Sequence, residues 1–437
     1  MARRATEIKR LQQQSPNSLA VDVGMWAPRL DADPNPEARG IANLKCMSAM
    51  GYHAAGVSPE DFRFGTSHFL AAKEAAEFPL LACNLAAAGG GEPLTDGSTV
   101  VRAAQMKVGL IGVSTKQDLS KIGPDSTRSN DPLLQQELES VTFLDASESV
   151  KREIARLPRD LSLTIVLSAL PPEENVDLAK ANPEIDLIIT THKITELIKP
   201  PAASRHHVVG STYIVCGSET VVGQLLPRIQ LTLRNGKIAD LAMSVSWLRS
   251  DIPEDKTVRA ICWDFYRSMI EKMGLPPGEK RLAWASPENN PKAKYVGAED
   301  CRRCHAAEFK EWQGTTQQKP RHRVPHQAAW LKLLQRYWYF WPQCASCHTT
   351  GYGYESGFNL EDMSPHLRNV QCESCHGPGS LHIEEPKSDN IRGQPTRKHC
   401  DACHAGPLPS QCKLPRGHIG EYNRDFEAYW NAIIHKQ

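Results

Sequence analysis

Over the first 250 residues, short apolar runs alternate with segments in which apolar residues recur at helical spacing. The runs are rich in β-branched residues and predict buried strands, while helices are predicted over 38–50 and 67–77. Near-continuous apolar strands that alternate with helices are typical of an α/β domain. The predicted strands cover residues 18–23, 107–113, 161–167 and 186–190, followed by a hairpin of 224–233 and 238–246 that turns at Asn235-Gly236.

The pattern changes after residue 250. Apolar residues at helical spacing predict an amphipathic helix over 252–274, which Pro276 and Gly278 would end. The proline-containing stretch up to residue 294 predicts a linker. We therefore expect a domain over 1–250, a helix and linker over 251–294, and a second domain over 295–437.

Composition excludes some classes of function. The 437 residues include 51 Lys and Arg against 50 Asp and Glu, a net charge of +1. This balance argues against a nucleic-acid-binding protein, which usually carries an excess of basic residues. No apolar run approaches the roughly 18–20 residues that cross a bilayer, so we predict no membrane-spanning helix.

Cysteine and histidine are concentrated near the end of the chain, where nine of the 13 cysteines and eleven of the 16 histidines lie after residue 300. Eight of these cysteines form four copies of the pattern C-x-x-C-H. Two thiols one helical turn apart can form thioethers to one porphyrin, and the adjacent imidazole can bind its iron. The copies are Cys301-x-x-Cys304-His305, Cys344-x-x-Cys347-His348, Cys372-x-x-Cys375-His376 and Cys400-x-x-Cys403-His404.

One copy of the pattern could equally be a zinc half-site, a thioredoxin-like redox pair or part of a disulfide framework. A zinc site does not require a histidine after every second cysteine, yet here the histidine recurs in all four copies. We therefore predict four covalently attached haem c groups, in a mainly α, loop-rich domain.

Haem iron that only transfers electrons often has a second axial histidine. His326 opens a predicted helix, and His382 follows the tight turn Gly377-Pro378-Gly379, so either could reach an iron. The other candidates are His322, His366 and His418. Sequence alone does not pair these residues with particular haems. In the first domain, the pair His206-His207 could bind a metal or a nearby haem, but we expect it to lie in an exposed loop.

Residues 295–404 also carry Tyr295-Val-Gly-Ala-Glu-Asp-Cys301, Cys347-His-Thr-Thr-Gly-Tyr352 and Val370-Gln-Cys-Glu-Ser-Cys-His-Gly-Pro-Gly-Ser-Leu-His382. These stretches resemble the tetrahaem cytochrome c family that includes the electron acceptor of hydroxylamine oxidoreductase. The resemblance implies closely stacked haems, mostly with two histidine ligands and with one haem sometimes five-coordinate. It supports His382 and His326 as distal ligands. Segment 313–323 departs from the family's spacing, which leaves the partner of the first haem open.

The N-terminal domain carries Phe78-Pro-Leu-Leu-Ala-Cys-Asn84 and Ile185-Asp-Leu-Ile-Ile-Thr-Thr-His192. With residues 2–11 and 17–24, these segments resemble the 5′-nucleotidase branch of the calcineurin-like metallophosphoesterases. The resemblance implies an α/β sandwich and, in active members, hydrolysis at two metal ions. Two-metal hydrolysis requires several carboxylate, amide and imidazole ligands.

Most of those ligand positions carry other residues here. Met25 stands at the bridging aspartate, Pro59-Glu60-Asp61 at the Asn-His-Glu stretch, and Ser168-Ala169 at a Ser-His segment, so that only His192 remains. A thioether and a methyl group cannot replace oxygen or imidazole ligands. We predict a pseudo-phosphoesterase without catalytic residues.

The start of the chain lacks two expected features. Related proteins begin with a strand that bears an Asp-x-His pair, and haem attachment occurs outside the cytoplasm, yet residues 1–7 contain no apolar signal segment. We expect a longer natural N-terminus that holds the first strand and a signal peptide. The expected location is periplasmic or extracellular.

The function expected from these observations is electron transfer rather than catalysis. The four haems would carry electrons, while the N-terminal domain would dock a redox partner protein or a second copy of the chain. Two alternatives belong to the enzyme class. One is a redox enzyme that acts on small nitrogen or oxygen species at a five-coordinate haem, and the other is a metallophosphatase with an atypical metal site.

Overall fold

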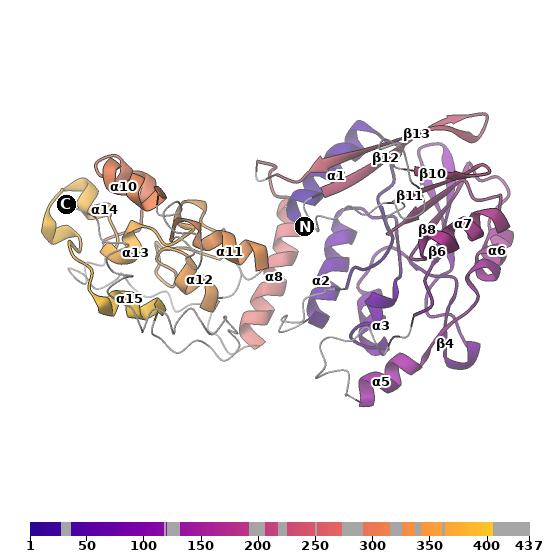
Figure 1. Ribbon diagram of the computed structural model, residues 1–437, viewed down its shortest axis with the longest axis horizontal. Coiled ribbons are helices and arrows are strands. Elements are labelled where there is room, and N and C mark those ends of the chain that lie inside the picture. Colours follow the sequence, from indigo (N-terminus) through magenta and orange to yellow (C-terminus); the bar gives the residue numbers. More distant parts are fainter. Residues whose placement is uncertain are drawn as a thin grey trace. The chain divides into compact units, whose positions relative to one another are not determined.

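The chain divides into two compact units, Met1–Phe265 and Tyr266–Gln437, which are described separately. The domain boundaries predicted at residues 250 and 294 remain predictions. No helix in the described part of the chain is long and apolar enough to cross a membrane. The computed structural model (Figure 1) describes residues 1–27, 36–117, 119, 132–191, 206–216, 225–249, 251–272, 292–314, 326–336, 342–360 and 363–404.

The first unit is built on a six-stranded sheet of order β10-β11-β9-β8-β6-β5. Neighbours among β6, β8, β9 and β11 pair in parallel, and the two outer strands pair antiparallel. Every residue of β8 and β9 is buried, as their near-continuous apolar sequences predict. The strands are β5 (Ser98–Ala103), β6 (Met106–Val113), β8 (Leu163–Ser168), β9 (Leu187–Thr190), β10 (His206–Val209) and β11 (Thr212–Cys216). The loop expected for His206-His207 is wrong, because both residues lie in β10 and pair with β11.

Each face of this sheet is covered by a different layer. Helices α6 (Ala146–Arg156) and α7 (Pro172–Ala181) bury Val150 and Leu178 against one face. Helix α6 begins at Asp145, whose carboxylate accepts a hydrogen bond from the Glu148 amide at 2.8 Å. The opposite face packs on a second sheet, so the unit is an α/β sandwich as predicted.

The second sheet is parallel and has three short strands, β1 (Val21–Asp22), β2 (Ala54–Gly56) and β3 (Leu80–Leu81). Gly112 in β6 permits its close approach to the larger sheet, because a Cβ atom there would lie 1.9 Å from the Leu81 carbonyl oxygen. A smaller antiparallel pair joins β4 (Leu85–Ala87) to β7 (Val141–Phe143).

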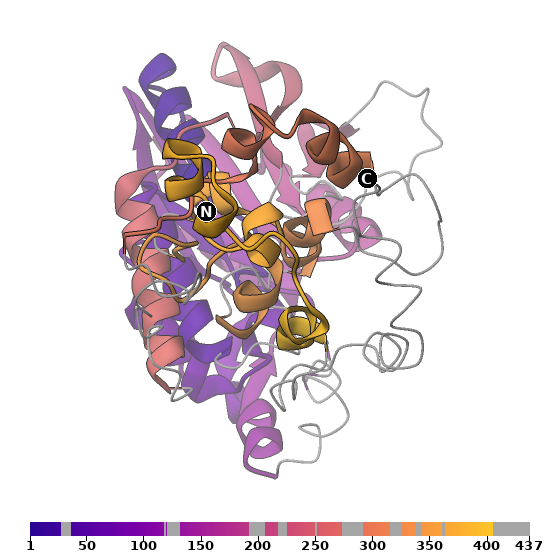
Figure 2. The same cartoon turned by 90° about the vertical axis from the view of Figure 1, so that its left-hand side faces the viewer.

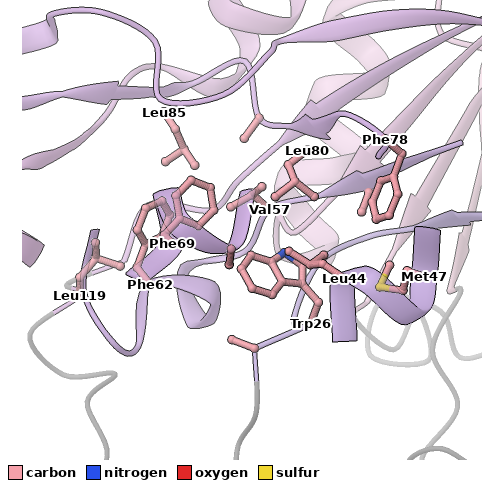
Figure 3. Close-up of a cluster of buried hydrophobic side chains, with 14 of the residues drawn as sticks. Trp26, Leu44, Met47, Val57, Phe62, Phe69, Phe78, Leu80, Leu85 and Leu119 are labelled. Atoms are coloured by element: carbon pink, nitrogen blue, oxygen red, sulfur yellow. The ribbon is translucent and has the colours of Figure 1, made fainter. Parts of the chain in front are cut away.

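A buried aromatic cluster lies beside the three-stranded sheet (Figure 3). Phe62 and Phe69 stack with their ring centroids 4.3 Å apart, and Trp26 lies 6.0 Å from Phe69. Burial of each large side chain contributes about 1.5–3 kcal/mol. The flanking helices are α2 (Pro36–Ala49), α3 (Thr66–Glu74) and α5 (Pro132–Glu139), and the first two confirm the helices predicted there.

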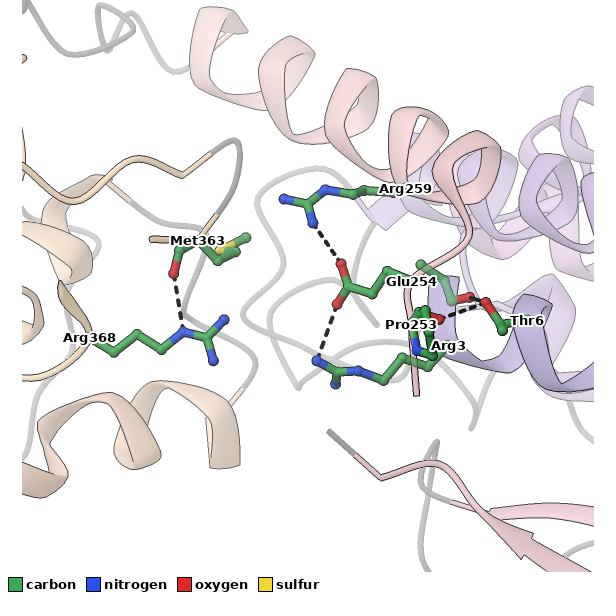
Figure 4. A network of polar contacts seen from close by, with 8 residues as sticks. Arg3, Thr6, Pro253, Glu254, Arg259, Met363 and Arg368 are labelled. Atoms are coloured by element: carbon green, nitrogen blue, oxygen red, sulfur yellow. Dashed lines mark hydrogen bonds and ion pairs between the residues drawn. The ribbon is translucent and has the colours of Figure 1, made fainter. Parts of the chain in front are cut away.

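The predicted hairpin is formed by β12 (Leu225–Arg234) and β13 (Lys237–Trp247). Its turn residues Asn235 and Gly236 have φ values of 51° and 73°, the left-handed pair that Asn-Gly turns favour. The predicted amphipathic helix is α8 (Lys256–Lys272). Just before it, Glu254 forms ion pairs with Arg3 of α1 (Ala2–Gln14) at 3.3 Å and with Arg259 at 2.9 Å (Figure 4).

The second unit consists of short helices joined by turns, as predicted (Figure 2). The Arg368 side chain donates to the Met363 carbonyl at 3.1 Å, and Trp330 packs on Phe358 with ring centroids 5.2 Å apart. The helices are α9 (Ala298–Arg302), α10 (Ala306–Gly314), α11 (Ala329–Arg336), α12 (Pro342–His348), α13 (Cys372–His376), α14 (Ser380–Glu384) and α15 (Arg397–His404). Single 3-10 turns lie at His326–Ala328, Pro365–Leu367 and Ser388–Asn390.

Candidate haem-binding residues and the edge of the sandwich

Each C-x-x-C-H motif lies on a short helix or at its end. Helices α12, α13 and α15 contain the second, third and fourth motifs. The first motif begins in α9, and its turn is closed by a 3.0 Å bond from the His305 amide to the Cys301 carbonyl. Helical spacing brings the two sulfurs of a motif to one side of the helix, which thioether attachment to one porphyrin requires.

Two motif histidines are oriented by backbone carbonyls. His348 Nδ1 lies 2.7 Å from the Ala329 carbonyl oxygen, and His376 Nδ1 lies 2.7 Å from that of Arg392. A carbonyl oxygen only accepts, so Nδ1 carries the proton in each ring and Nε2 carries the lone pair. This arrangement, in which one ring nitrogen is held by the protein, is common in metal-binding histidines.

The rings of His305 and His382 lie near each other, with centroids 6.2 Å apart and an interplanar angle of 26°. His382 Nδ1 in turn lies 3.0 Å from the Lys387 carbonyl oxygen. Two imidazoles bound to one metal ion each place a nitrogen about 2 Å from it, which sets their centroids about 6 Å apart. The 6.2 Å separation is compatible with two ligands of one iron if a nitrogen of each ring points toward the metal.

The buried carboxylate of Glu373 connects the segments that carry these two histidines. It accepts hydrogen bonds from the amides of Val296 at 3.0 Å, Gly297 at 2.8 Å and Gly379 at 2.7 Å. The first two amides precede the first motif, and the third belongs to the turn before His382. Burial raises the pKa of Glu373, while the three amide bonds lower it.

This role of Glu373 was not predicted from the sequence. The residue occupies one of the two variable positions inside the third motif, where side chains of many types occur. Nothing in the local pattern distinguishes it from an exposed acid such as Glu299, which pairs with Arg302 on the surface at 3.2 Å.

The structure also brings cysteines of different motifs together. The nearby Cys372 side chain raises the pKa of the Cys301 thiol, and the nearby Cys403 side chain lowers the pKa of the Cys347 thiol. The first motif therefore lies against the third, and the second against the fourth. None of the eight motif cysteines, all of which lie among the described residues, is paired in a disulfide.

The structure gives fewer contacts for the remaining candidate haem ligands. His326 opens a 3-10 turn, and its carbonyl accepts a 3.1 Å bond from the Val370 amide close to the third motif. His366 is exposed in another 3-10 turn. The roles of both as ligands stay predictions. His322, His418 and His192 lie outside the described residues, as does the side chain of His404.

In the first unit, Met25 stands where the resemblance to metallophosphoesterases expects a bridging aspartate. This residue lies in a hydrogen-bonded loop. Met25 has a φ of 66°, and its amide donates to Asp61 at 3.0 Å. The Asp61 carboxylate also accepts from the Ala27 amide at 3.0 Å, the Ser58 amide at 2.9 Å and the Ser58 hydroxyl at 3.0 Å. Asp61 is fully buried, and burial raises its pKa to about 6. Its oxygens are thus engaged by the loop.

The carboxyl ends of β8 and β9 carry neutral groups that bind one another. The Ser168 hydroxyl donates to the Asn175 side-chain oxygen at 2.6 Å, and the Asn175 amide lies 3.4 Å from the Thr190 hydroxyl. No cluster of three His, Cys, Asp or Glu side chains that could hold a metal ion occurs among the residues that the structure describes.

Comparison with known proteins separates the chain in the same way. Residues 300–377 match the family model of cytochrome c554 and c-prime. Cytochrome c-554 of Nitrosomonas europaea is 33% identical over 141 residues, which cover 31% of this chain and 54% of that protein. The predicted resemblance of the C-terminal part is confirmed. A c-type cytochrome carries covalently attached haem, so the similarity implies haem c in this part of the chain.

The N-terminal part is similar to 5′-nucleotidases. That of Vibrio cholerae is 25% identical over 243 residues, which cover 50% of this chain and 40% of that protein. A solved 5′-nucleotidase precursor from Thermus thermophilus is 20% identical, with a TM-score of 0.48, and the match covers 68% of this chain and 57% of that one. The chain thus spans about half of each relative's length, and it joins a 5′-nucleotidase-like part to a cytochrome c554-like part.

Proposed function

We propose that this protein is an electron carrier outside the cytoplasm, with four covalently attached haem c groups. The four C-x-x-C-H motifs carry this proposal, and the rings of His305 and His382, with centroids 6.2 Å apart, support two histidines at the first iron. A histidine on each side favours six-coordinate iron, which transfers electrons without binding a substrate.

The residues have separate roles in this proposal. The eight motif cysteines form the thioethers, and His305, His348, His376 and His404 are the proximal ligands. His382 is the distal ligand of the first haem. The candidates for the other distal positions are His326, His366, His322 and His418. The Ala329 and Arg392 carbonyls hold His348 and His376 in the tautomer that binds metal through Nε2.

Haem supplies one-electron redox chemistry, and the protein sets the spacing and ligands of the haems. The contacts of Cys301 with Cys372 and of Cys347 with Cys403 support close spacing of the first haem with the third and of the second with the fourth. Short distances between cofactors allow electrons to pass along the domain without redox-active side chains.

The 5′-nucleotidase-like part acts in this proposal as a pseudoenzyme that docks a redox partner protein or a second copy of the chain. Two features support the loss of phosphoesterase chemistry. Met25 offers a thioether where a bridging carboxylate is needed, and Asp61 is occupied by the loop amides. A metal ion would have to displace these bonds to recruit Asp61.

Two measurements test the proposal on the full chain. Denaturing mass spectrometry should give the mass of the polypeptide plus four haems, and a redox titration should show several one-electron steps. A protein that binds zinc and carries no covalent haem would contradict the proposal.

The variant His382→Ala tests the assignment of the first haem. It should convert one of the four haems from low-spin to high-spin in the ferric absorption and electron paramagnetic resonance spectra, with all four still attached. The matched control is His206→Ala in the N-terminal unit, which should leave the spectra unchanged. Unaltered spin states in His382→Ala would show that another residue is the ligand.

A further inference from the structure

The N-terminal end of α8 is held against α1 and α2 in the first unit. Lys9 of α1 pairs with Asp255 at 2.7 Å, and the Asp255 amide donates to the Ala2 carbonyl at 3.2 Å. On α2, the Arg39 guanidinium lies over the Phe265 ring, 5.1 Å from its centroid. These contacts attach residues 255–265 to the helices of the first unit.

Two cysteines meet inside this contact. The sulfurs of Cys46 on α2 and Cys262 on α8 are 3.7 Å apart, and Cys46 is 1% exposed. An apolar cluster that includes Met50 and Val258 surrounds them. The shared hydrogen bond raises the pKa of Cys46 and lowers that of Cys262 to about 7, so near neutral pH Cys262 is the partner with thiolate character.

We propose that Cys46 and Cys262 form a disulfide that links α2 to α8. The inference rests on the extracytoplasmic location in the proposed function, because structural disulfides persist in oxidising compartments. A disulfide has an S–S distance of about 2.0 Å, so the two sulfurs need to approach by less than 2 Å.

The oxidant is a disulfide-bonded thiol oxidoreductase of that compartment. The Cys262 thiolate attacks one sulfur of the oxidoreductase disulfide. This step forms a mixed disulfide and releases the other sulfur of the oxidoreductase as a thiolate. Cys46, after losing its proton, attacks the Cys262 sulfur and releases the second thiolate. Two electrons pass to the oxidoreductase, which takes up the two protons and leaves as a dithiol.

Other cysteines of the first unit are poorer partners. Burial raises the pKa of Cys83 to about 12, which suppresses its thiolate, and the Cys216 thiol donates to the Thr191 carbonyl at 3.8 Å. The pair on α2 and α8 therefore combines proximity with a reactive thiolate.

Thiol counting on the native, haem-loaded chain tests the inference. Haem attachment uses eight of the 13 cysteines, so alkylation in denaturant without reductant should label three thiols, and alkylation after reduction should label five. Tryptic peptides 46–63 and 260–267 should be recovered as one disulfide-linked species. Five labelled thiols before reduction would overturn the proposal.

Two variants sharpen the count. Cys46→Ser should give four labelled thiols with or without reductant, whereas the control Cys83→Ser should give two without reductant and four with it. Hydrogen exchange of α8 amides should increase several-fold on reduction of the wild type and stay unchanged in Cys46→Ser. Linked peptides in a protein that lacks haem would sustain the disulfide while refuting the haem assignment.

Discussion

Polar side chains serve opposite purposes in the two units. At the edge of the sandwich they bind each other and the backbone, as Asp61 does with the Met25 and Ala27 amides. In the cytochrome c554-like unit, His348 and His382 each use Nδ1 on a carbonyl and keep Nε2 for another partner. In the proposed function, the first arrangement is a closed site, whose polar groups bind one another, and the second is a prepared site, whose histidines are oriented for haem iron. In this proposal, the 5′-nucleotidase-like unit has lost the chemistry of the family it resembles, whereas the cytochrome c554-like unit keeps it.

The largest expected effect, on the number of attached haems, comes from replacing both cysteines of one C-x-x-C-H motif. The double variant Cys372→Ser and Cys375→Ser cannot form thioethers at the third motif, so denaturing mass spectrometry should find three haems instead of four. The matched control, Cys83→Ser, should keep all four. An unchanged haem count in the double variant would refute the assignment of this motif.

The closed site should respond to pH through Asp61. Its pKa of about 6 lies above the usual 3.8, so between pH 4 and pH 6 the unfolded chain releases a proton that the folded chain retains. Folding stability from this group is complete below pH 4 and falls by about 3 kcal/mol as pH rises through 6.

Urea denaturation at several pH values, followed by circular dichroism, measures this slope. Asp61→Asn should lack it, whereas Ser58→Ala, which keeps the carboxyl group, should retain it. Identical pH dependence in the wild type and Asp61→Asn would mean that Asp61 ionises normally in the folded protein.

A smaller effect is expected from the carboxylate that holds the prepared site. Glu373→Gln replaces one acceptor oxygen with an NH₂ group that faces backbone amides, which costs about 1–3 kcal/mol of folding stability. The spacing of His305 and His382 should loosen, so part of the first haem should become high-spin in the ferric spectrum. Glu299→Gln, on the exposed face of α9, should change neither property.

The last prediction is that the N-terminal unit has no phosphoesterase activity. Assays with phosphomonoesters and nucleotides should detect no hydrolysis with added Mn²⁺, Mg²⁺ or Zn²⁺, because the sandwich edge offers thioether and neutral groups in place of metal ligands. Turnover that depends on added metal and is lost in Asp61→Asn would show that the N-terminal unit is an active phosphoesterase.

Local sequence patterns predicted much of the fold. Strands β6, β8 and β9 follow from near-continuous apolar runs, and the β12–β13 turn follows from Asn235-Gly236. The strand predicted over 18–23 is only two residues long in β1, and His206-His207 lie in β10 rather than in a loop. Pairing with the next strand, β11, decides the second case, and a segment of four residues is too short to show a periodic pattern.

The sequence by itself determined where haem is predicted to attach, because the two cysteines that form thioethers and the histidine that binds iron lie within five consecutive residues. Only the tertiary structure decided that the ring of His382 lies near that of His305, that Glu373 bonds to both of their segments, and that Cys262 meets Cys46. Glu373 binds an amide 77 residues away, and Cys262 lies 216 residues from Cys46. Periodicity reports the geometry of neighbouring residues, whereas contacts over such distances depend on how complete helices and strands pack.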